Sequence, residues 1–401
     1  MGPPTGRGTT HTLKGRFCPG QGAPRRGRSR FFGQSRVCAL ATGRILRCAV
    51  HVRGKSVSKG ERVHQDKSEQ ERAYALIDLG DEIITARALQ IAAELKIADL
   101  LAAGPCSVED LAGQTGSEAG ALHRMMRLLA SRGLFREVEP GVFELTGKGG
   151  PLRSDHPLSV RSVLTLTGAV APVVMDGVHH SLRTGEATFP AVTGQDIYDH
   201  MVQHPEQGRL FDEAMQELTR VVTPAVLDAY DFSEASRIID VGGGSGALLN
   251  AILHHEPEAN GIVFDTPRVA DLARERIRQQ GLTDRCSVVS GDFFGEIPAG
   301  GDLYLLKWVL HNWSDEQATD ILRGCRRAMD GDSKLLIIES ILPPDDSFHP
   351  GKAMDLSMLV LLGGCERTEE EFTALLARAD LKVEQVIPTM SPHSLVQASA
   401  R

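Results

Sequence analysis

Residues 236–401 alternate short apolar segments with amphipathic ones, and this alternation constrains the fold more than any other feature of the sequence. Apolar segments lie near residues 236–241, 261–265, 286–292, 302–313 and 333–340, and all but the third are followed by a helical pattern. Two more lie near 381–388 and 393–399. Strands without polar alternation are typical of parallel sheets covered by helices on both faces. The sequence therefore predicts an α/β domain with a mostly parallel seven-stranded sheet, whose ligands bind at the carboxyl ends of the strands.

A glycine-rich turn, D-V-G-G-G-S-G-A at residues 240–247, follows the first of these strands. Glycines let the backbone turn tightly and let a ligand approach it closely. The turn alone is ambiguous, because Gly242, Gly244 and Ala247 also satisfy the dinucleotide fingerprint. Asp265, at the end of the second strand, stands where a carboxylate would bind ribose hydroxyls in either case.

Two acidic positions favour S-adenosylmethionine over a dinucleotide. Asp240 ends the first strand directly before the glycines, where it would repel a pyrophosphate and tolerate an ammonium group. Asp292 and Phe293 follow the third strand and can bond an adenine amino group and stack on its ring. S-adenosylmethionine carries adenine, ribose and an amino-acid group without phosphate. NAD(P) remains the alternative.

One histidine and two carboxylates are expected near this cofactor. His311 lies between the fourth strand and a helix that begins with a capping box at 314–317. Glu339 ends the fifth strand, and Glu366 precedes a helix capped at 368–371. All three belong to the ligand edge of the sheet. A histidine flanked by carboxylates is a general base with a fixed tautomer and a stabilised cation.

Residues 66–155 follow a helix, helix, hairpin order that is typical of a winged helix, with the hairpin turning at 140–141. A DNA-binding regulator is thus a second function class. Residues 66–150 hold nine basic and 14 acidic side chains, whereas duplex binding needs a positive footprint. We therefore expect a packing or dimerisation module and no nucleic acid partner.

Residues 156–232 are expected to form a helical linker, with breaks at Pro172, Pro190 and Pro224. No apolar stretch approaches the roughly 18 residues of a membrane-spanning helix, so no membrane partner is expected. The seven cysteines and the histidines lack zinc spacing and C-x-x-C pairs, which predicts no metal site and reduced thiols in the cytoplasm.

The first 65 residues form a separate, basic segment with 14 basic side chains and one acidic one, whereas the rest of the chain holds 30 and 51. Rich in arginine, glycine and proline, it is expected to be disordered. It could be an organelle transit peptide or a basic arm for RNA or an anionic membrane. We favour a third interpretation, upstream sequence translated from a start codon assigned too early.

Six motifs, occurring in order, carry a family resemblance. They are D-V-G-G-G-S-G, F-D-T-P-R-V, G-D-F-F, K-W-V-L-H-N-W-S-D-E, E-S-I-L-P and G-G-C-E-R-T-E-E-E-F. Together, over about residues 70–400, the chain resembles the class I S-adenosylmethionine-dependent small-molecule O-methyltransferases, such as the caffeic acid, acetylserotonin and hydroxyneurosporene enzymes. The resemblance implies a Rossmann-like methyltransferase domain at 233–401, preceded by an α-helical winged-helix dimerisation domain at 66–155 that forms a homodimer. The linker 156–232 would contribute to the acceptor pocket.

The resemblance also implies roles for individual residues and a reaction. Gly242 would meet the methionine part of the cofactor, Asp265 the ribose, and Asp292 and Phe293 the adenine, while Lys307 would lie along the cofactor. His311 would be the general base between Glu339 and Glu366. Met215 and Met358 would line the acceptor pocket. The implied reaction moves a methyl group to a hydroxyl of an aromatic or polyketide-like small molecule.

Two positions depart from the plant members of the family. Asn312 replaces an Asp after the base, which predicts a slightly less basic His311 unless Glu339 compensates. Cys365 stands where a Lys is frequent. Some bacterial relatives bind the cofactor but hydroxylate or decarboxylate, and these often lack the histidine. His311 therefore favours methyl transfer, with such a non-methylating enzyme and an NAD(P)-dependent oxidoreductase as alternatives.

Overall fold

The computed structural model describes residues 59–401, with side chains from residue 68 onward. The chain forms two compact units, residues 1–66 and 67–401. Of the first unit, only the backbone of 59–66 is described, as the first turns of helix α1 (Lys59–Glu94). The expectations for the basic segment otherwise fall outside the described residues.

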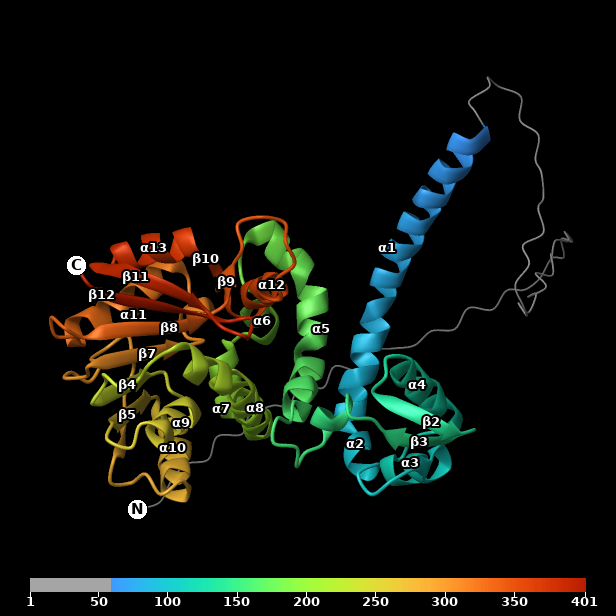
Figure 1. Cartoon of the computed structure of the whole chain (residues 1–401), viewed down its shortest axis with the longest axis horizontal. Helices are drawn as coiled ribbons and strands as arrows, with labels where there is room; N and C mark the ends of the chain where they lie inside the picture. Colours follow the sequence, from blue (N-terminus) through green and yellow to red (C-terminus); the bar gives the residue numbers. More distant parts are fainter. Residues whose placement is uncertain (1–58) are drawn as a thin grey trace, which may run out of the picture. The chain divides into compact units, whose positions relative to one another are not determined.

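A small winged helix forms the N-terminal part of the second unit (Figure 1). After α1 it contains α2 (Ile97–Leu100), β1 (Cys106–Ser107), α3 (Val108–Thr115), α4 (Ala119–Ser131), β2 (Phe135–Glu139) and β3 (Val142–Leu145). The strands form an antiparallel sheet in the order β1-β3-β2. Met126, Leu129 and Phe143 are fully buried in its core. The predicted helix, helix, hairpin order is confirmed, with Gly141 at φ 78° in the hairpin turn.

The linker is a group of helices that continue without interruption at their proline residues. It contains η1 (Gly150–Leu152), α5 (Arg161–Thr184), α6 (Thr188–Thr193), α7 (Ile197–Gln203) and α8 (Pro205–Ala229). The predicted breaks were wrong, because Pro172 lies inside α5 and Pro224 inside α8. Each proline removes one intrahelical hydrogen bond, but α5 and α8 pack along each other, and such packing supplies most helical stability. Pro190 is the third residue of α6, where the missing N–H has no intrahelical partner anyway.

Helix α5 also corrects the expectation about apolar stretches. Among the described residues it is the one helix long and apolar enough to cross a membrane, by length and composition. The same test is passed by core helices of proteins that meet no bilayer. In this structure α5 packs on α1 at Gly168, whose carbonyl accepts from Arg87 at 3.3 Å, and on α6 at Gly177, whose carbonyl accepts from Thr188 at 2.8 Å.

The C-terminal domain is built on a seven-stranded sheet in the order β11-β12-β8-β7-β4-β5-β6. Its strands are β4 (Arg237–Val241), β5 (Asn260–Asp265), β6 (Cys286–Ser290), β7 (Leu303–Lys307), β8 (Lys334–Glu339), β11 (Leu381–Pro388) and β12 (Ser394–Ala400). Strands β4 to β8 are parallel, whereas β12 pairs antiparallel with both β8 and β11. The predicted mostly parallel, Rossmann-like sheet is confirmed.

Helices cover both faces of this sheet (Figure 1). The intervening elements are α9 (Ala247–His255), α10 (Pro267–Gln279), η2 (Leu310–Asn312), α11 (Asp315–Ala328), β9 (Ile341–Leu342), α12 (Gly351–Leu362), β10 (Arg367–Thr368) and α13 (Glu369–Ala377). Leu303 and Leu305 pack with residues of α8, α9 and α10, whereas Tyr304 and Leu306 pack with α11 and α13. Burial on both faces explains why the strands lack polar alternation.

Candidate active site

The glycine-rich turn after β4 has a backbone that only glycine adopts easily. Gly242, Gly244 and Gly246 have φ values of 70°, 60° and 71°. A Cβ on Gly242 would also stand 2.9 Å from Val309 Cγ2. The backbone N–H of Gly244 donates to Asp265 Oδ2 at 2.8 Å, so the turn and the predicted ribose carboxylate are already linked. This arrangement leaves a bare backbone for a ligand at the carboxyl ends of β4 and β5.

Asp240 lies beneath this turn as a buried carboxylate without a hydrogen-bond partner on either oxygen. Burial raises its pKa, and the ammonium of Lys307 opposes that rise. Burial likewise lowers the pKa of Lys307, against the attraction of Asp240 and Glu339. A buried carboxylate with unsatisfied oxygens fits a site that receives a donor or a cation.

Lys307 connects the sheet to the linker. Its Nζ donates to Thr219 Oγ1 on α8 at 3.1 Å and lies 3.6 Å from the centre of a Trp308 ring. Thr219 Oγ1 in turn donates to the carbonyl of Met215 at 2.7 Å. Helix α8 therefore reaches the strand ends through Thr219, a residue that sequence reasoning missed because only the fold brings it to Lys307.

An aromatic group stands at the predicted adenine site. Phe293 lies close to Gly242, and its ring is 5.9 Å from Trp313 in an edge contact. Tyr198 of α7 stacks on Trp313 at 6.4 Å, and Trp313 Nε1 is buried without a partner. The exposed Asp292 accepts the backbone N–H of Phe294 at 2.9 Å. The sequence analysis did not single out Trp313, although a second tryptophan directly before the capping box was a usable signal.

His311, Glu339 and Glu366 meet as predicted. His311 Nδ1 lies 2.8 Å from Glu366 Oε1 and 3.5 Å from Glu339 Oε2. Both carboxylates are buried, and the imidazole is mostly buried. Since carboxylates accept, we assign the imidazole proton to Nδ1, which leaves Nε2 as an acceptor.

Local structure fixes each of these three groups. The predicted capping boxes at Ser314 and Thr368 are both confirmed. They start α11 and α13 shortly after His311 and Glu366. Glu339 Oε1 accepts the backbone N–H groups of Leu310 at 3.0 Å and His311 at 3.4 Å, which ties the end of β8 to the turn that carries the histidine.

The carboxylates raise the pKa of His311. Burial disfavours the imidazolium, but the charges of Glu339 and Glu366 and the bond to Glu366 outweigh burial, so the pKa lies above the ordinary 6.5. Burial raises the pKa of Glu339, partly offset by His311. Glu339 is thus one of the groups that raise the pKa of His311, and the lower basicity expected from Asn312 relative to an aspartate stays a prediction.

The same three side chains have the composition of a metal site, since their ligand atoms lie within 4.8 Å of one another. However, the direct bond between His311 Nδ1 and Glu366 occupies the ring nitrogen that would face such an ion. One carboxylate oxygen of Glu339 also accepts hydrogen bonds from two backbone N–H groups. The geometry favours proton transfer over metal ligation.

The two methionines expected at the acceptor pocket lie on helices that reach the site. Met215 lies on α8 one turn before Thr219, and Met358 is buried on α12, which packs on η2. Their contact with an acceptor stays an expectation.

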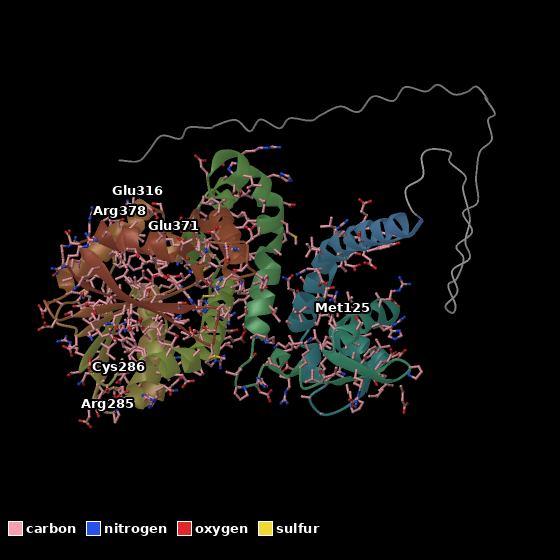
Figure 2. All side chains as sticks on the ribbon, turned by 45° about the horizontal axis from the view of Figure 1, so that its top comes forward. Met125, Arg285, Cys286, Glu316, Glu371 and Arg378 are labelled. Atoms are coloured by element: carbon pink, nitrogen blue, oxygen red, sulfur yellow. The ribbon has the colours of Figure 1, made fainter. Side chains whose placement is uncertain are left out.

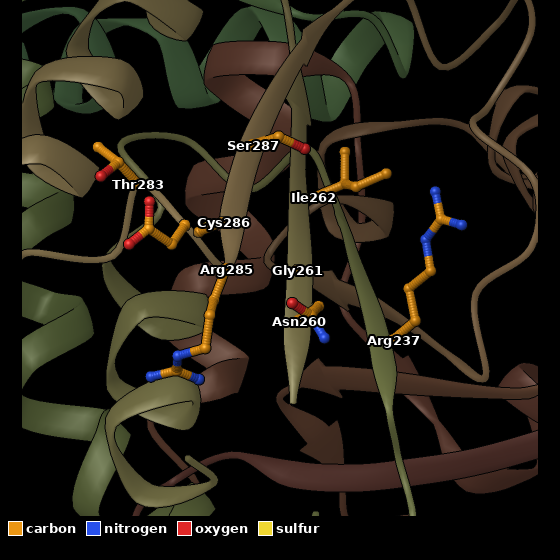
Figure 3. A pocket seen from close by; sticks show the side chains of 9 residues that line it. Arg237, Asn260, Gly261, Ile262, Thr283, Arg285, Cys286 and Ser287 are labelled. Carbon is orange, nitrogen blue, oxygen red and sulfur yellow. The ribbon is translucent and has the colours of Figure 1, made fainter. Parts of the chain in front are cut away.

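One shallow hollow lies away from all these residues. It is lined by Arg237, Asn260, Arg285, Cys286 and their neighbours, where β4, β5 and β6 begin (Figure 3). This edge is opposite to the strand ends that carry Asp265 and Glu339, so the hollow is not the site described above. Cys286 and Arg285 are also labelled on the whole domain in Figure 2.

Comparison with known proteins finds O-methyltransferases that match most of the chain. A family model described as an O-methyltransferase domain matches residues 174–382, and one described as an O-methyltransferase dimerisation domain matches residues 77–149. Phenazine O-methyltransferase PhzM of Lysobacter antibioticus is 46% identical over 312 residues, which cover 78% of this chain and 92% of the relative. Aclacinomycin 10-hydroxylase RdmB of Streptomyces purpurascens is 34% identical, covering 81% and 88%.

Solved structures agree. The LaPhzM crystal structure superposes with a TM-score of 0.78 at 43% identity, covering 82% of this chain and 99% of LaPhzM. The O-methyltransferase NcsB1 from neocarzinostatin biosynthesis, in complex with S-adenosylmethionine and 2-hydroxy-5-methyl naphthoic acid, gives 0.69 at 35% identity, covering 79% and 96%.

Proposed function

This chain belongs to the O-methyltransferase family, and on that premise we propose that it moves a methyl group from S-adenosylmethionine to a hydroxyl of an aromatic or polyketide-like small molecule, with His311 as general base. The observation that carries the proposal is the 2.8 Å bond from His311 Nδ1 to Glu366, with Glu339 at 3.5 Å. NcsB1, which shares the fold, was solved with a hydroxylated naphthoic acid, an acceptor of this chemical class.

The residues at the strand ends fit the cofactor. The Gly242 turn offers bare backbone to its methionine part, and Asp240 beneath the turn has two unpartnered oxygens for an ammonium group. Asp265 would take the ribose hydroxyls, Asp292 and Phe293 the adenine, and Lys307 would lie along the cofactor. When bound, S-adenosylmethionine supplies a methyl group made electrophilic by its sulfonium.

His311 then has one task, to accept the proton of the acceptor hydroxyl at Nε2. A phenol has a pKa of about 10 and an ordinary histidine about 6.5, so proton transfer ahead of attack is uphill. The raised pKa of His311 narrows this gap. Glu366 keeps the other ring proton on Nδ1, and both carboxylates stabilise the imidazolium that forms. The enzyme otherwise aligns the acceptor and excludes water.

The N-terminal domain supports a homodimer, and we propose the cytoplasm as its location. Large apolar side chains of α1 are 48–71% exposed in the single chain, namely Tyr74, Leu76, Ile77, Leu79, Ile83 and Ile84. Large apolar side chains exposed together on one helix are typical of a protein–protein interface. We assign residues 66–155 to dimerisation, 156–232 to the acceptor pocket and 233–401 to cofactor binding.

Two measurements test the function. Calorimetric titration with S-adenosylmethionine, S-adenosylhomocysteine and NAD(H) should show binding of the two adenosyl ligands only, and binding of NAD(H) alone would overturn the cofactor. An acceptor screen by mass spectrometry should show a gain of one CH2 unit per turnover. A gain of one oxygen would instead support hydroxylation, the activity in the name of the relative RdmB, and loss of carbon dioxide would support a decarboxylase.

A further inference from the structure

A buried guanidinium lies directly behind the catalytic histidine. Arg367 is 2% exposed, although arginine is rarely buried without partners. Four of its hydrogen bonds are present: Nε donates to Asp315 Oδ1 at 3.0 Å, Nη1 to the carbonyls of Leu310 at 3.1 Å and Cys365 at 3.3 Å, and Nη2 to the carbonyl of Trp313 at 3.0 Å. Nη2 also forms an ion pair with Asp315 Oδ1 at 2.9 Å.

These acceptors belong to the two segments that carry the base and its partner. Leu310 and Trp313 bracket the turn that holds His311, and Cys365 precedes Glu366. The segments also touch through backbone, since a Cβ on Gly364 would stand 2.1 Å from the carbonyl oxygen of His311. One side chain thus joins the histidine turn to the glutamate segment.

We infer that Arg367 is a positioning residue, which holds the His311 turn and the Glu366 segment at the spacing that the Nδ1–Oε1 bond requires. Glu366 and Arg367 are adjacent, and Glu366 bonds the imidazole while Arg367 bonds the backbone on either side of it. Asp355 Oδ1 of α12 accepts the Glu366 N–H at 2.8 Å and also fixes this segment. The expected effect of Arg367 on the rate rests on the proposed role of His311 as general base. Its expected effect on the pKa of the His311 imidazole does not.

The planar fork of arginine is essential to this role. A lysine keeps the positive charge beside Asp315 but concentrates its donors on one atom, so it cannot bond carbonyls on several sides. Arg367→Lys therefore separates the geometry from the charge. Arg378 gives a matched control, because it pairs with the other oxygen of Asp315 at 3.5 Å and touches neither segment. It is exposed at the end of α13 and is labelled in Figure 2.

The test compares Arg367→Lys with Arg378→Lys in the full-length protein. NMR titration of the His311 imidazole should show a lower pKa in Arg367→Lys, because the contact with Glu366 loosens while the net charge is unchanged. The kcat should fall on the order of 10²-fold, as expected for a misplacement of about 1 Å, while the KM for S-adenosylmethionine stays the same. Arg378→Lys should match the wild type in all three.

A second variant guards against misfolding. The double change Arg367→Gln with Asp315→Asn removes both charges, so neither the buried guanidinium nor the half-exposed carboxylate is left without its partner. It should lower the His311 pKa and kcat in the same direction as Arg367→Lys. If the folded variants lose thermal stability but keep the wild-type pKa and a kcat within twofold, the positioning role is wrong. If the pKa falls but no acceptor is methylated even by the wild type, the positioning stands and the proposed function fails.

Discussion

The side-chain amide of Asn312 donates to the backbone carbonyl of Trp308 at 3.0 Å. Trp308 has φ 56°, a left-handed conformation that costs free energy in a bulky residue. The amide therefore stabilises the strained backbone of Trp308, which follows β7 and lies three residues before His311. An aspartate at 312 could only accept, and its ionised oxygen would face the carbonyl.

Asn312→Asp should accordingly lower the free energy of unfolding by about 1–3 kcal/mol, the cost of an unsatisfied polar contact. Urea denaturation at neutral pH would measure it. Asn260→Asp, on an exposed residue at the start of β5, is the control and should be nearly neutral. Equal stability of Asn312→Asp and the wild type would show that the bond to Trp308 is dispensable.

His311→Ala should reduce kcat by about two to four orders of magnitude, the usual size of a general-base contribution. The affinity for S-adenosylmethionine should persist, because the histidine is placed on the acceptor side. Steady-state kinetics and calorimetry would separate the two. The exposed His254→Ala serves as the control, and retained turnover in His311→Ala would remove the base role.

The pH profile of kcat should have its acidic limb above pH 6.5. His311 must be neutral to accept a proton, and its pKa is raised by Glu339 and Glu366. The rate is therefore lost as pH falls through this raised pKa. Glu366→Gln removes one of the anions, so its acidic limb should move to lower pH and its maximum should fall. A limb that stays in place would assign the titration to another group.

Asp265→Ala should weaken S-adenosylmethionine binding by about 10- to 10²-fold, equivalent to a lost hydrogen bond to a charged group. The variant also loses the acceptor for the Gly244 N–H, so the glycine turn should loosen. Calorimetry would measure the affinity. Asp271→Ala, 82% exposed at its side chain on α10, is the matched control, and unchanged binding in Asp265→Ala would mean that the ribose site lies elsewhere.

The metal-free interpretation also has a direct test. Activity should be unchanged after dialysis against a chelator, because His311 Nδ1 bonds Glu366 directly. Loss of activity that returns with an added divalent cation would instead assign the three side chains to a metal site. Assays of the wild type and of Glu366→Gln with a chelator present distinguish proton transfer by His311 from a metal site.

The sequence predicted those features whose causes are local. The caps at Ser314 and Thr368 are written in four-residue patterns, and they placed His311 and Glu366 on the ligand edge of the sheet. Features that depend on distant partners were missed. Pro172 was expected to break a helix that packing maintains, and the role of Arg367 depends on carbonyls more than 50 positions away in sequence, at Leu310 and Trp313.

The antiparallel strand β12 lies between β8 and β11, although it follows both in sequence. Strand β8 pairs with β7 on its other side, whereas β11 has no partner in the sheet until β12 has been synthesised. Until β12 pairs with β8, one hydrogen-bonding edge of β8 is open. The last strand of the sheet therefore joins β8 and β11 together, and a strand edge that is open before this step can pair with another chain.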